Sequence, residues 1–164
     1  LPLASAIPPA LAVGHAQGRV ELLDGAGGRH VYEGKLRDGQ PSGHGTYTFP
    51  DGRLYEGQWS GGAMHGMGRF RWSAMNEHSG SFFGGGIEGY GKRVYADGDS
   101  YLGEWCNGKK EGAGTYTHAN GDSYAGEWVA DVKQGSGDFT YADGETYAGM
   151  WEGGAHVPGS KKRG

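Results

Sequence analysis

Tyr55-Glu56-Gly57-Gln58-Trp59, then Ser60-Gly61-Gly62-Ala63, then Gly66-Met67-Gly68 is the stretch that decides the fold of this chain. In its first part Tyr, Gly and Trp alternate with Glu and Gln, and a period of two that includes aromatic residues is typical of a β-strand. The next four residues are glycine-rich and indicate a turn. A second alternation begins at Gly66, so the stretch predicts a β-hairpin with one face of aromatic rings and glycines.

This hairpin pattern returns every 23 residues without an insertion. Its Tyr-x-Gly motif begins at Tyr32, Tyr55, Tyr101, Tyr124 and Tyr147, and in the middle copy His78 replaces the tyrosine. Its Gly-x-Gly motif keeps the same period and begins at Gly43, Gly66, Gly89, Gly112 and Gly135. A fixed period of this length indicates stacked units, each of which contacts mainly its neighbours.

The junctions between the units carry a second hairpin signal. They contain Asp51-Gly52, Asp97-Gly98, Asn120-Gly121 and Asp143-Gly144. Asp-Gly and Asn-Gly favour type I′ turns, in which two residues have positive φ. No segment shows a helical period. The sequence therefore predicts an all-β fold: an elongated single-layer antiparallel meander of stacked β-hairpins with about twelve strands. Residues 1–18 form a non-repeat N-terminal arm in this prediction, residues 19–152 the repeat array, and residues 153–164 a short basic tail.

The composition excludes several classes of protein. The chain has 36 glycines in 164 residues, but its five Trp, ten Tyr and five Phe recur in register with them, which argues against disorder. The net charge of −4 argues against nucleic acid as the main partner. A lone cysteine, Cys106, rules out an intrachain disulfide framework and fits a reducing, intracellular compartment.

The residues that could carry chemistry do not form a recognisable site. The seven histidines share no repeat position and have no metal-ligand spacing. There is no nucleophile elbow, and the glycine pairs lack the helix and the Lys-Ser/Thr that a phosphate loop requires. We therefore expect no enzyme activity, no catalytic residue, no metal and no cofactor.

A single layer leaves its aromatic face with two alternatives, because a domain normally buries such a face against a second layer. Rings lying on glycines either bury the face completely, or leave a groove that a partner protein covers. In the second case, the expected groove residues are Tyr55, Trp59, Trp72, Phe82, Tyr101, Trp105, Tyr124 and Trp128. Loss of Trp105 is then expected either to abolish partner binding or to unfold the array. A different hypothesis is a membrane adaptor that meets anionic lipid through Lys92, Arg93, Lys109 and Lys110.

The motifs resemble the MORN repeat (membrane occupation and recognition nexus), in which Tyr-x-Gly-x-Trp and a short turn precede Gly-x-Gly. The strongest matches begin at Tyr55, Tyr101 and Tyr124. The resemblance implies a scaffold or adaptor that binds a protein within a cytoskeletal, ciliary or flagellar structure or another large assembly. It leaves open lipid binding, homo-oligomerisation, and the alternative of an accessory subunit in an organellar complex such as a mitochondrial one.

Overall fold

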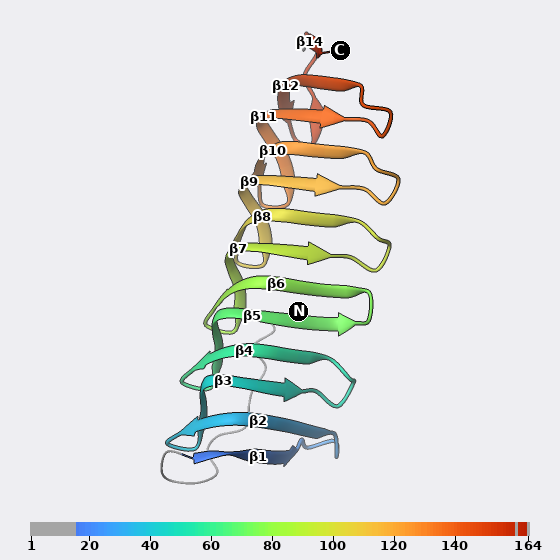
Figure 1. Ribbon diagram of the computed structural model, residues 1–164. Helices are drawn as coiled ribbons and strands as arrows, with labels where there is room; N and C mark the ends of the chain where they lie inside the picture. Colours follow the sequence, from blue (N-terminus) through green and yellow to red (C-terminus); the bar gives the residue numbers. More distant parts are fainter. Residues whose placement is uncertain (1–15, 160, 164) are drawn as a thin grey trace. The chain divides into compact units, whose positions relative to one another are not determined.

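The computed structural model describes residues 16–159 and 161–163, and every regular element in these ranges is a strand (Figure 1). Most of the predicted N-terminal arm lies outside the described residues. The strands are β1 (Ala16–Leu23), β2 (Arg29–Arg37), β3 (Gln40–Thr48), β4 (Leu54–Ser60), β5 (Ala63–Ser73), β6 (Asn76–Phe83), β7 (Gly86–Val94), β8 (Ser100–Cys106), β9 (Lys109–Thr117), β10 (Ser123–Val129), β11 (Val132–Thr140), β12 (Thr146–Glu152), β13 (Ala155–His156) and β14 (Lys161–Arg163). These ranges contain no helix with the length and hydrophobicity needed to cross a membrane.

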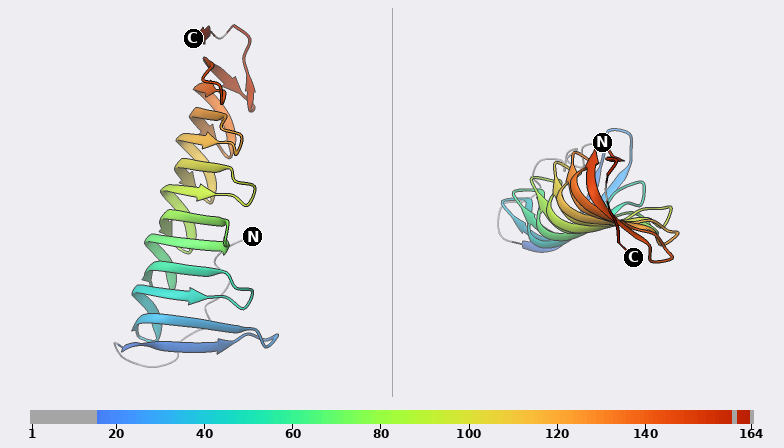
Figure 2. Two further views of the ribbon diagram at one scale, coloured as in Figure 1. Left: turned by 45° about the vertical axis from the view of Figure 1, so that its right-hand side comes forward. Right: turned by 90° about the horizontal axis from the view of Figure 1, so that it is seen from above.

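The strands follow one another in the sheet in the order of the sequence, from β1 to β13. Two compact units divide between Ile87 and Glu88. In the first unit, each of β1 to β5 pairs antiparallel with its successor. In the second, β7 to β12 do the same. The prediction of an antiparallel all-β meander is confirmed, and β1 to β12 are the expected twelve strands (Figure 2).

Two short strands complete the second unit, and the sequence pattern did not predict them. β13 pairs with the C-terminal end of β12, at Trp151 and Glu152. β14 pairs with the N-terminal half of β12, from Thr146 to Ala148. Both strands fall in the segment expected to be a short basic tail.

The turns differ from the prediction in type. At Asp51-Gly52 only the glycine has positive φ, +86°, and the Gly52 N–H donates to the Phe49 carbonyl at 3.0 Å. This is the three-residue hairpin connection, in which a β-turn is followed by one left-handed residue, so the predicted type I′ turn is wrong here. Asp51 instead accepts a hydrogen bond from the Arg53 N–H at 3.2 Å, as turn aspartates commonly do.

Two consecutive positive φ values, the mark of a type I′ turn, occur inside the repeats. The residue pairs are Asp38-Gly39, Gly61-Gly62, Gly84-Gly85, Asn107-Gly108, Ala130-Asp131 and Gly153-Gly154. The pair Ala130-Asp131 contains no glycine, and the φ of Ala130 is +47°. An L-residue other than Gly, Asn or Asp rarely adopts this conformation, so Ala130 is locally strained.

We predict that Ala130→Gly stabilises the protein by about 0.5–1 kcal/mol, because glycine adopts positive φ without the clash of a Cβ. The Ala130 N–H donates to Glu111 at 2.9 Å, and this hydrogen bond is independent of the side chain. Urea denaturation would measure the change. The matched control is Ala125→Gly in β10, where the strand conformation gives no such relief and the substitution should destabilise. A loss of stability in Ala130→Gly would contradict the proposed strain.

The core is a series of rings lying on glycines. Tyr101 and Tyr124 are fully buried, and Tyr101 lies across Gly103 of its own strand and Gly114 of the next. A methyl group at Gly114 would lie 2.5 Å from Tyr101 Cε2 and closer still to the hydroxyl oxygen. Equivalent rings cover Gly45, Gly68 and Gly137. The second glycine of each of these Gly-x-Gly motifs therefore provides space for a ring.

Hydrogen bonds fix the buried rings in position. The Tyr124 hydroxyl donates to the Glu127 carbonyl at 3.1 Å, and burial raises the pKa of Tyr124 to about 12. Trp128 Nε1 donates to the Gly114 carbonyl at 3.1 Å. The same pair of interactions recurs in the units that begin at Tyr55 and Tyr101. In these repeats the tyrosine donates to a carbonyl of its own repeat, and the tryptophan donates to a carbonyl of the repeat before it.

Candidate partner-binding surface

The residues predicted to line a groove lie mostly in the core. Seven of them are at most 5% exposed: Tyr55, Trp59, Phe82, Tyr101, Trp105, Tyr124 and Trp128. Trp72 is the exception and is partly exposed. Tyr55, Tyr101 and Tyr124 lie on glycines, and the three tryptophans and Phe82 pack edge-on against these tyrosines. The contact of the seven with a partner stays a prediction.

A second set of rings on the aromatic face is open to solvent. These side chains occupy one repeat position, 23 residues apart, and we call them the rim residues: Phe49, Trp72, Tyr95, His118 and Tyr141. The first four are half-buried, and Tyr141 is exposed, at 43%. Trp72 lies near the end of β5, and each of the others directly follows a strand. Two belong to the first unit and three to the second.

Each rim residue is supported from below by the side chain two positions earlier, because residues i and i+2 of a strand share a face. The ring centroids are 4.8 Å apart for Tyr47–Phe49 and 4.5 Å for Phe70–Trp72. They are 4.9 Å apart for both Tyr116–His118 and Phe139–Tyr141. In the third copy the guanidinium of Arg93 takes this place, 5.2 Å from the centroid of Tyr95.

The turns between consecutive repeats fix the backbone of the rim residues. The His118 N–H donates to the Asp122 carbonyl at 2.8 Å, and the His118 carbonyl accepts from the Gly121 N–H at 2.9 Å. Phe49, Tyr95 and Tyr141 make the same two bonds with their own turns. The rim is therefore preorganised, which lowers the entropy that a partner must overcome.

Asp99 ties one turn to the next in the second unit. Its carboxylate accepts from the Tyr116 hydroxyl at 2.6 Å, from the Ala119 N–H at 2.9 Å and lies 3.1 Å from His118 Nδ1. These hydrogen bonds, that of Tyr116 first, lower the pKa of Asp99 below its usual value. Asp122 repeats the link by accepting from the Ala142 N–H at 2.9 Å.

Two lysines lie beneath the rim and pack against aromatic rings, a role that the sequence did not predict. Lys110 Nζ is 5.1 Å from the centroids of both Tyr116 and Trp128. Lys133 Nζ is 4.9 to 5.1 Å from the rings of Tyr124, Phe139 and Trp151, and burial lowers its pKa. This repeat position holds Pro41, Met64, Ile87, Lys110, Lys133 and His156 in succession.

The residues of the lipid hypothesis do not form one basic patch. Lys92 and Lys109 are exposed, whereas their neighbours Arg93 and Lys110 are half-buried and point to the opposite face, as strand alternation requires. Burial lowers the pKa of Arg93. Lys110 also lies 3.6 Å from Asp131 and is thereby partly neutralised. The arrangement leaves two scattered cations to meet a lipid surface.

The carboxylates in the turns between repeats accept hydrogen bonds from the backbone. Asp97 and Asp143 each accept from the N–H two residues on, at 3.1 and 3.0 Å. Among residues 16–159 and 161–163, no three His, Cys, Asp or Glu side chains are grouped so that they could hold a metal ion.

Period alone could have identified the rim. Phe49, Trp72 and Tyr141 stand at the solvent end of an alternating run in the sequence, one position type per repeat. Of the rim residues, the sequence prediction included only Trp72; the other predicted groove residues occupy the Tyr and Trp positions of the Tyr-x-Gly-x-Trp motif. The tyrosines that pack on glycine become core, whereas the rings near or just past a strand end remain accessible.

Comparisons with known proteins agree with the repeat pattern. The family model described as the MORN repeat matches residues 32–52, 55–74, 78–100, 101–123 and 124–146. No curated protein matches the chain significantly. Among solved structures, the chain is similar to the TCP domain of SAS-4 (dCPAP) of Drosophila melanogaster, which was solved in complex with a proline-rich motif of Ana2 (dSTIL). The identity is 12% and the TM-score 0.48, over 98% of this chain and 97% of that chain.

Proposed function

This chain belongs to the MORN repeat family, and from that premise we propose that it is a non-catalytic scaffold that binds a partner protein through its rim residues. The observation that carries the proposal is that partly or fully exposed rings recur at one repeat position in both units. Aromatic side chains at a partly desolvated surface are the usual anchors of protein interfaces. MORN repeats are generally non-catalytic, and the family resemblance favours a partner within a cytoskeletal, ciliary or other large assembly.

The rigidity of the rim supports the same proposal. Each ring rests on another side chain, and all but Trp72 are also fixed by their turns, so a partner does not have to order them. The five rings also differ in chemistry: Phe49 is purely apolar, Tyr95 and Tyr141 carry hydroxyls, and His118 is hydrogen-bonded to Asp99. Because the rim positions present different side chains, they can distinguish between partners.

We predict that the double variant Trp72→Ala/Tyr141→Ala loses its partner while remaining folded, because both rings are partly exposed. Cross-linking mass spectrometry in native cells would compare it with the wild type. We expect recovery of the main cross-linked protein to fall at least tenfold, as two lost aromatic anchors imply.

The matched control is Met67→Ala/Met150→Ala, which removes two apolar side chains that are 60% and 55% exposed on the other face of β5 and β12. This variant should recover the same protein as the wild type. Equal recovery by the rim variant would rule out the rim as the binding surface, and the absence of any recurrent cross-linked protein would rule out the scaffold.

A further inference from the structure

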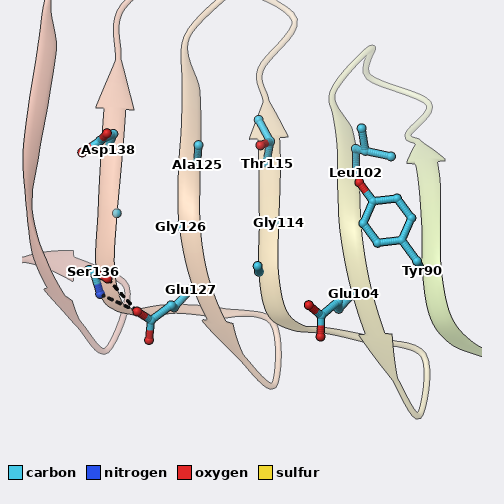
Figure 3. Close-up of a pocket in the computed structure, with 12 residues that line it drawn as sticks. Tyr90, Leu102, Glu104, Gly114, Thr115, Ala125, Gly126, Glu127, Ser136 and Asp138 are labelled. Atoms are coloured by element: carbon cyan, nitrogen blue, oxygen red, sulfur yellow. Dashed lines mark hydrogen bonds between the residues drawn. The ribbon is translucent and has the colours of Figure 1, made fainter.

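The second unit has a depression on the face opposite its aromatic core (Figure 3). Its volume is about 580 Å³, and it extends across β7 to β11. The residues that line it alternate along the strands with buried rings such as Tyr101 and Tyr124, so they point away from the rim. The depression is therefore a separate surface from the one proposed above, and the two can be tested independently.

A strip of bare backbone forms the floor. Gly114 lies opposite Gly126, and Gly126 lies opposite Gly137. The Cβ position of each points to the tyrosine face, so these three positions leave only backbone in the depression. The glycines are required by the tyrosine rings on the other face. These strands already pair with both neighbours, so their backbone N–H and C=O groups are not available to a bound segment. Such a segment must be recognised by side chains.

Two rows of side chains flank the strip, as Figure 3 shows. Cross-strand register places Leu102, Thr115, Ala125 and Asp138 in one row. The other row contains Tyr90, Glu104, Glu127 and Ser136. One end of the depression is thus apolar, with Tyr90 57% exposed and Leu102 44% exposed. The remaining lining carries three carboxylates, Glu104, Glu127 and Asp138, among small neutral residues.

The acidic groups of the depression form no ion pair with any side chain that the structure describes. Among the residues that the structure describes, no basic group lies within ion-pair distance of Glu104, Glu127 or Asp138. Glu127 is held in place by Ser136, whose hydroxyl donates to it at 2.6 Å and whose N–H donates at 3.3 Å. These bonds lower the pKa of Glu127, so its carboxylate stays ionised.

The first unit shows that the charge is not needed by the fold. Gln58 occupies the repeat position of Glu104 and Glu127, and its side-chain oxygen accepts from the Met67 N–H at 2.8 Å. This hydrogen bond corresponds to the one from Ser136 to Glu127. A neutral amide therefore satisfies the backbone equally well, which leaves the two carboxylates of the second unit free to serve recognition.

We infer that this depression binds an extended basic segment of a protein, with two Lys or Arg residues three positions apart and an apolar residue at one end. Glu104 and Glu127 lie two strands apart, about 10 Å at the usual strand spacing. In the polyproline II conformation, which unfolded segments favour, residues i and i+3 project from one side about 9.3 Å apart. The apolar residue meets Tyr90 and Leu102, where Lys92 beside Leu102 disfavours a cation.

The probe is an array of immobilised ten-residue peptides that carry leucine at one end and two arginines spaced two, three or four positions apart. We expect the full chain to bind the three-spaced peptide best, with binding that weakens as salt is raised. Glu104→Gln/Glu127→Gln should weaken it at least tenfold. Tyr90→Ala/Leu102→Ala should weaken the leucine-ended peptide and leave a leucine-free version unaffected.

The control variant Glu56→Gln/Glu152→Gln removes the same charge from two other exposed positions. It should bind like the wild type. Three results would each overturn the inference: no basic peptide is retained, the Glu104/Glu127 variant binds normally, or the control variant loses binding equally. The rim variant Trp72→Ala/Tyr141→Ala should leave peptide binding intact, so failure of the rim proposal and failure of this one are distinguishable.

Discussion

Gly114→Ala is expected to destabilise the protein by about 3 kcal/mol, the upper part of the range for an overpacked core. The added methyl group would lie 2.5 Å from Tyr101 Cε2, and this ring is fully buried. The ring cannot move away easily, because its hydroxyl donates to the Glu104 carbonyl at 3.1 Å. For a chain of this length the thermal midpoint should fall by about 6–12 °C. Differential scanning calorimetry would measure it.

Gly86→Ala provides the matched control. A methyl group at Gly86 would meet its nearest atom, the Phe83 carbonyl oxygen, at 3.7 Å, which is an ordinary contact. We expect its stability to change by less than about 0.5 kcal/mol. A Tyr101→Ala background should also reduce the cost of Gly114→Ala, because the clashing ring is gone. If both glycine variants unfold at the same temperature, the ring-on-glycine account of the core is wrong.

The second large effect is expected from Trp105→Ala, at about 3–5 kcal/mol. Trp105 is 4% exposed, packs edge-on against Tyr101 at 5.0 Å and donates from Nε1 to the Gly91 carbonyl at 3.1 Å. From the sequence, either unfolding or lost partner binding was expected. The burial of this side chain favours unfolding, which circular dichroism under increasing urea would detect.

Trp105→Phe separates packing from hydrogen bonding. Phe82 occupies the same repeat position and is 2% exposed, so a phenyl ring fits the site. The variant loses the Nε1 donor and part of the ring, and we expect a cost of about 1–2 kcal/mol. A Trp105→Ala protein that retains full stability would show that this position is not part of the core.

The sequence was sufficient for the strands because alternation and period describe the backbone directly. Tyr55, Gly57 and Trp59 share a face as predicted, and the Gly-x-Gly strand lies beside them. Turn type was not predictable in the same way. Asp51-Gly52 has the composition of a type I′ turn, yet the type I′ geometry occurs at Ala130-Asp131, where composition argues against it. Strand register imposed by the neighbouring units overrides local preference there.

The candidate site was predicted only in part, for a physical reason. Alternation tells which face a ring occupies but not whether another ring will cover it. Tyr101 and Tyr95 stand on the same face, but Tyr101 lies over two glycines and is buried, whereas Tyr95 follows the end of its strand and is partly exposed. Lys110 was assigned to a lipid surface by charge alone, whereas four aromatic rings lie within 6 Å of its ammonium group.

The pairing of each strand with its immediate successor bears on how the chain folds. All-β proteins usually fold slowly, because strands distant in sequence must meet before they gain any stability. Here the paired strands of the repeats are connected by turns of only a few residues. The entropic cost of closing each loop is therefore small. One hairpin in either unit can nucleate folding, and the neighbouring hairpins can then add to it one after another.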